Sequence, residues 1–113
     1  MTNVDVMANE FARNFYLERK KFLKYSFESI EQLNLEENDT EKVKSFISTL
    51  LTDVFYTILM GLEGEASLGE IQQTYKIYDE EENLISNCGE LEVEAYEYFH
   101  ENKYEAGNAD LKK

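Results

Sequence analysis

Residues 43–62, VKSFISTLLTDVFYTILMGL, decide the fold of this 113-residue chain. Apolar residues recur here at spacings of three and four, the pattern of one helix face. The other face is polar and includes Lys44, Ser48 and Thr52. We therefore predict a helix whose unbroken apolar stripe faces the core. The stripe consists of Val43, Phe46, Ile47, Leu50, Leu51, Val54, Phe55, Ile58, Leu59 and Leu62.

A second amphipathic pattern precedes this helix. Apolar residues between about Asp5 and Leu33 fall roughly on one helical face, with a possible break near residues 26–29. A short polar connection, residues 34–39, joins the two patterns, so we predict an antiparallel helical hairpin. Gly61 is expected to end the second helix as a left-handed cap.

The C-terminal half has a different pattern. Residues 71–78 favour a strand, the acidic residues 79–83 a turn, and residues 84–86 a returning strand. A last helix is expected over about 90–104. The prediction is a helix-dominated α+β fold of order α-α-β-β-α, with a long N-terminal helical hairpin and a small antiparallel β-hairpin. Residues 1–105 form one domain, and residues 106–113 form a frayed tail.

The chain is strongly acidic, with 24 Asp and Glu against 11 Lys and Arg, a net charge of −13. This charge opposes binding to nucleic acids and to anionic membranes. No uniformly apolar run of about 20 residues is present, and the N-terminus lacks a signal-peptide pattern, so we expect a bacterial cytoplasmic protein. Cys88 is the only cysteine, which excludes an internal disulfide.

The charge is unevenly distributed. Residues 1–57 hold 10 acids and 7 bases, a net of −3, and residues 58–113 hold 14 acids and 4 bases, a net of −10. Acids beside tyrosines suit a basic protein partner, because tyrosine rings accept Lys or Arg in cation–π contacts; solubility is the alternative reason for the acids. The candidate protein-binding residues are Tyr78, Glu80, Glu81, Glu82, Glu94, Glu97, Tyr98 and Glu101.

A weak divalent-metal site is a further hypothesis. Asp79, Glu81, Asn83 and Glu90 occupy positions 1, 3, 5 and 12 of a calcium-loop spacing. Position 6, which needs glycine, is Leu84, so an Asx-type turn is the preferred interpretation. We expect no cofactor.

Catalytic motifs are not evident. Cys88 and His100 supply two of the roughly four ligands that zinc needs, and the negative surroundings oppose a reactive thiolate. The glycines at 64 and 69 have P-loop spacing, but Glu70 and Ile71 stand where Lys and Ser or Thr are required. We therefore expect a protein that is not an enzyme.

Residues 55–100 resemble a layout found in small acidic bacterial proteins, some of the toxin-immunity type. The resemblance rests on Tyr56-Thr57-Ile58-Leu59-Met60-Gly61-Leu62-Glu63-Gly64, on Tyr75-Lys76-Ile77-Tyr78-Asp79-Glu80 and on Asn83-Leu84-Ile85, with Glu63 where the pattern prefers Asp. It implies a cytoplasmic inhibitor that binds a basic partner. A scaffolding homodimer and a metal-binding protein are the alternatives.

Overall fold

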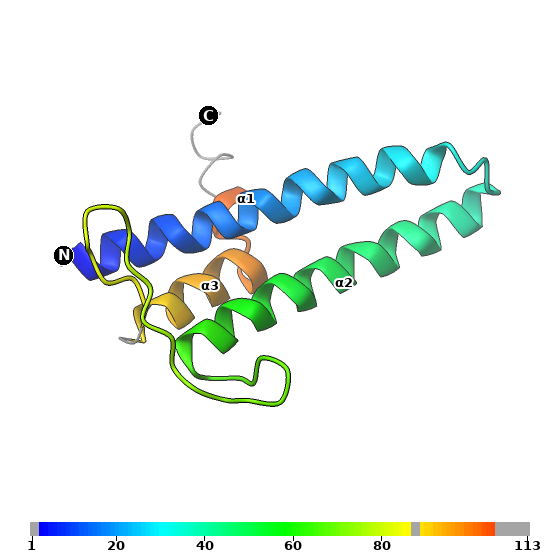
Figure 1. Cartoon of the computed structure of the whole chain (residues 1–113). Helices are drawn as coiled ribbons and strands as arrows, with labels where there is room; N and C mark the ends of the chain where they lie inside the picture. The colour runs from blue at the N-terminus through cyan, green and yellow to red at the C-terminus, as the bar shows by residue number, and fades with distance from the viewer. Residues whose placement is uncertain (1–2, 87–88, 106–113) are drawn as a thin grey trace, which may run out of the picture.

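Two long antiparallel helices and one short helix make up the part of the chain that the computed structural model describes, residues 3–86 and 89–105 (Figure 1). Helix α1 spans Asn3–Glu31, α2 spans Glu37–Glu63 and α3 spans Glu90–His100. The predicted helical hairpin is confirmed, and α1 continues without a break through residues 26–29. Helix α3 ends earlier than predicted, and Asn102, two residues beyond it, has a left-handed backbone (φ 58°).

Gly61 does not cap α2, contrary to prediction. The helix continues to Glu63, and Gly64 takes the left-handed conformation at φ 91°. Gly61 instead lies buried inside the helix, where a Cβ atom would be 2.5 Å from Cγ of Leu68. Glycine at 61 therefore lets the segment after α2 pack closely against the helix.

The α+β fold class is wrong, because the described residues contain no β-strand and the predicted β-hairpin is absent. Only isolated bridges form there, between Leu68 and Ile71 and between Tyr78 and Leu84. The hydroxyl of Ser86 accepts the N–H of Ile77, and it also donates to the carbonyl of Tyr75. A side chain thus takes the place of a strand partner, and the ladder does not extend.

The core lies at one end of the hairpin, which we call the packed end. There α3 lies against α1 and α2, and the segment 64–86 crosses the hairpin (Figure 1). Small residues on α1 let α3 approach closely. The buried cluster consists of Ala8, Ala12, Tyr16, Leu59, Met60, Leu91, Ala95 and Tyr98.

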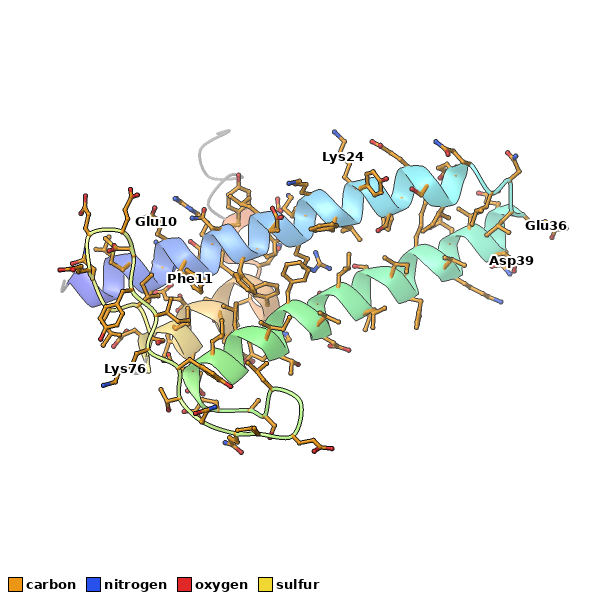
Figure 2. All side chains as sticks on the ribbon, in the orientation of Figure 1. Glu10, Phe11, Lys24, Glu36, Asp39 and Lys76 are labelled. Atoms are coloured by element: carbon orange, nitrogen blue, oxygen red, sulfur yellow. The ribbon has the colours of Figure 1, made fainter. Side chains whose placement is uncertain are left out.

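The other end of the hairpin, residues 19–52, we call the free end. Figure 2 shows Glu36 and Asp39 at its tip, far from α3, and Lys24 pointing away from α2. In the middle of the hairpin α2 turns its polar side toward α1, since Arg19 is buried against Ser48 and Thr52. The prediction that the whole apolar stripe faces the core is therefore wrong: Leu59 is fully buried, but Phe46 is 58% exposed.

Candidate functional site

The predicted protein-binding residues fall on two separate elements. Tyr78, Glu80, Glu81 and Glu82 lie in the exposed turn of the segment 64–86. This turn lies beside α1, because Asp79 and Ile85 line a hollow together with residues of that helix. The remaining four residues, Glu94, Glu97, Tyr98 and Glu101, belong to α3 or its C-terminal end.

Three of the α3 residues are engaged inside the protein. Tyr98 is buried, and its hydroxyl donates to Oδ1 of Asn9 at 2.7 Å. Nζ of Lys103 donates to Glu94 at 2.6 Å and to Glu97 at 3.1 Å. Burial lowers the pKa of Lys103, but these two hydrogen bonds outweigh that effect, and the net pKa is raised. Tyr98 therefore belongs to the core, and Lys103 offsets part of the charge of the two carboxylates.

The predicted metal residues form a turn. Oδ1 of Asp79 accepts the backbone N–H groups of Glu81 and Asn83, both at 2.9 Å, and Oδ2 accepts Nδ2 of Asn83 at 3.0 Å. The hydrogen bonds from Asn83 and Glu81 lower the pKa of Asp79. Within residues 3–86 and 89–105, no three His, Cys, Asp or Glu side chains come together as metal ligands. The geometry is that of the Asx-type turn, and Cys88 lies outside the described residues.

The outer side of α3 holds a hollow of about 290 Å³. Tyr56 of α2 and Tyr96 of α3 contribute aromatic rings, and Val93 adds an exposed apolar side chain. Carboxylates surround these side chains. The full lining is Tyr56, Glu92, Val93, Tyr96, Glu97 and Glu101, and we call this site the α3 hollow.

The α3 hollow is electronegative. Burial and then the charge of Glu92 raise the pKa of Tyr56, so its phenol stays protonated at neutral pH. Neither Glu92 nor Glu101 forms a salt bridge within the described part of the chain. The ring of His100 lies edge-on to Tyr56, with centroids 4.5 Å apart, and 5.1 Å from Tyr96. A cation entering here would meet both aromatic rings and carboxylates.

No family model, curated protein or solved structure matches this chain. Its function therefore has to be argued from the surfaces of the molecule.

A second surface lies on the side of the hairpin away from α3. Phe15 and Phe55 contact each other edge-to-face at 5.7 Å, whereas the residues that follow them, Tyr16 and Tyr56, both contact Phe99 of α3. The two sides of the hairpin are thus distinguished by consecutive residues, with α3 on the tyrosine side.

The phenylalanine side stays apolar beyond the packed end. Val54 is about 160° around α2 from Tyr56, and Tyr25 is about 180° around α1 from Tyr16, so both point away from α3. A row of every fourth residue winds along α2 from its outer edge at Phe46 onto this side. We call the following exposed residues the open apolar face: Phe22, Tyr25, Phe46, Leu50, Val54 and Ile58.

The length and composition of α2 also meet the criteria for a membrane-crossing helix. An 18-residue window has a mean hydropathy of 1.5, and 17% of it is buried. The sequence analysis missed this segment because single polar residues interrupt every apolar run. Core helices of soluble proteins meet the same criteria, but those are mostly buried. The low burial of α2 shows instead that much of its apolar surface has no cover in the single chain.

Proposed function

We propose that this protein is a non-catalytic protein-interaction module that binds a basic partner, and that the α3 hollow receives a lysine or arginine side chain of that partner. The observation that carries the proposal is the combination of two aromatic rings with the carboxylates of Glu92 and Glu101. A cation held between a ring face and carboxylates gains both cation–π and ion-pair attraction.

The resemblance to immunity proteins supplies the class of role. Such an inhibitor would cover a basic surface of a toxin in the cytoplasm. The net charge of −13 supports this role, because it would speed the encounter with a cationic partner. In this proposal the acidic turn at residues 80–82 adds long-range attraction, and the α3 hollow provides the specific contact.

The test is a titration of the whole chain with a short arginine-containing peptide, followed by NMR of the aromatic and amide resonances. We expect the largest shifts at Tyr56, Tyr96 and His100, and we expect weaker binding as salt rises. Tyr96→Ala should weaken binding about fivefold to tenfold, the equivalent of a cation–π contact of roughly 1 kcal/mol.

The matched control is Tyr25→Ala, which removes an exposed tyrosine from the far side of the hairpin. Equal effects of the two substitutions would contradict a site in the α3 hollow. Shifts confined to residues 79–82, with Tyr96 unaffected, would place the contact at the acidic turn instead.

A further inference from the structure

The open apolar face is covered only at the packed end. There Leu68 lies against Gly61, and the loop residues Ser67 to Gly69 share a hollow with Val54 and Ile58. From Leu50 toward the tip, no described element outside the hairpin lies over α2. The hairpin is thus half of a helical bundle along the free end.

The exposed apolar area is what one side of a dimer needs. Phe22, Tyr25 and Phe46 are 46%, 69% and 58% exposed. With about 200 Å² for a full aromatic side chain, these three rings and the exposed aliphatic residues offer roughly 500 Å² of apolar area. A standard interface takes about 800 Å² from each partner, of which about 450 Å² is apolar.

The charge of the free end favours a second copy as the occupant. Residues 19–52 hold 6 acidic and 6 basic residues, a net charge of zero, so the entire −13 lies outside the free end. Two copies can therefore overlap their free ends without bringing net like charges together. An antiparallel arrangement would place the two acidic packed ends at opposite ends of the assembly, where salt screens their repulsion.

We propose that a second copy of this chain covers the open apolar face, with two hairpins stacked antiparallel about a twofold axis as a four-helix bundle. The interface is isologous, because each copy presents the same face to the other. The segment 64–86 limits the overlap, since it already lies over the packed end on this side. The α3 hollow faces away from the interface, so the dimer does not depend on the proposed function.

The experiment is sedimentation velocity of the whole chain over a series of concentrations. We expect a concentration-dependent species of 26.6 kDa, twice the 13.3 kDa of one chain. Val54→Glu and Leu50→Glu should each weaken dimerisation at least tenfold, because each buries an unpaired carboxylate in the interface.

The matched control is Val6→Glu. Val6 is 41% exposed on α1 at the packed end and Val54 is 42% exposed on the open apolar face, so the two substitutions add the same charge at similar exposure. Circular dichroism of each variant should show an unchanged helical content. Val6→Glu should leave the dimer intact.

Salt separates this proposal from the proposed function. Raising salt should strengthen the dimer by screening its acidic ends, whereas it should weaken binding of a basic peptide. A chain that stays at 13.3 kDa at every concentration would overturn the dimer, as would equal effects of Val6→Glu and Val54→Glu. A monomer that binds phosphatidylcholine vesicles and loses this binding in Val54→Glu would overturn it too, and would assign the face to a membrane.

Discussion

Nε of Arg19 donates a hydrogen bond to Oγ1 of Thr52 at 2.9 Å, in the middle of the helical hairpin. Nη2 of the same guanidinium donates to the carbonyl oxygen of Ser48 at 2.9 Å and to its hydroxyl at 3.0 Å. Arg19 is only 8% exposed. This contact holds the polar row of α2 against α1, and it thereby turns much of the apolar stripe to the outside.

We predict that Arg19→Ala lowers the free energy of unfolding by about 2–3 kcal/mol, because hydrogen bonds to a charged group are lost and the hydroxyls of Ser48 and Thr52 lose their partner. Urea unfolding monitored by circular dichroism measures this. Arg13→Ala, at an exposed position on α1, is the control and should change stability by less than about 0.5 kcal/mol. Equal losses would mean that the Arg19 contacts contribute nothing net.

The two leucines at positions 50 and 59 provide a test of the orientation of α2. Leu59 is fully buried in the core cluster, and Leu50 lies on the open apolar face. Leu59→Ala should cost about 2–5 kcal/mol at every protein concentration, since it leaves a cavity inside one chain.

Leu50→Ala should cost less than about 1 kcal/mol when the chain is monomeric, and its cost should grow with protein concentration as the dimer forms. Thermal unfolding at several concentrations distinguishes the two substitutions. If Leu50→Ala were as costly as Leu59→Ala in dilute solution, the apolar stripe would face the core of the single chain after all.

The sequence was sufficient to predict the two long helices and their antiparallel pairing, because 3.6-residue periodicity and a short connection are local signals. It could not show which side of α2 meets α1. The polar row Lys44, Ser48 and Thr52 reads as a solvent face until Arg19 is placed opposite to it. That pairing joins residues 33 and 29 positions apart, and periodicity carries no information about such a distance.

The same limit explains the errors in the C-terminal half. Thr, Tyr and Ile at residues 74–78 favour strands, but strand propensity needs a neighbouring strand to pair with. Ser86 provides side-chain hydrogen bonds there instead. The α3 hollow was only partly predictable. Glu97 and Glu101 were named from charge, whereas Tyr56 reaches the site from α2 and could be found only by folding the chain.

Gly61 gives a third prediction. Gly61→Ala should destabilise the chain by about 1–3 kcal/mol, because the added methyl would overlap the side chain of Leu68 and push the loop away from α2. Alanine by itself favours a helix interior over glycine by about 1 kcal/mol, so the double variant Gly61→Ala/Leu68→Ala should recover much of the loss. A double-mutant cycle measures this coupling, and simple additivity would contradict the close contact.

The stability of the fold should fall at alkaline pH. Burial raises the pKa of Tyr16 and Tyr98, and hydrogen bonds to acids raise the net pKa of Lys20 and Lys103. For each of these groups the folded chain holds its proton to higher pH than the unfolded chain does. Their contribution is therefore fully present below the unfolded pKa, about 10 for tyrosine, and it is lost as pH rises through the folded value.

We expect the melting temperature to decline above about pH 10 more steeply than the repulsion among acids explains, since those acids are already ionised at neutral pH. Tyr98→Phe removes one of the titrating groups together with its hydrogen bond to Asn9, so this variant should be less stable at neutral pH yet lose less stability between about pH 9 and 11. Tyr25→Phe, at an exposed position, is the control and should follow the parent chain. Parallel curves for the parent chain and Tyr98→Phe would show that Tyr98 does not couple ionisation to folding.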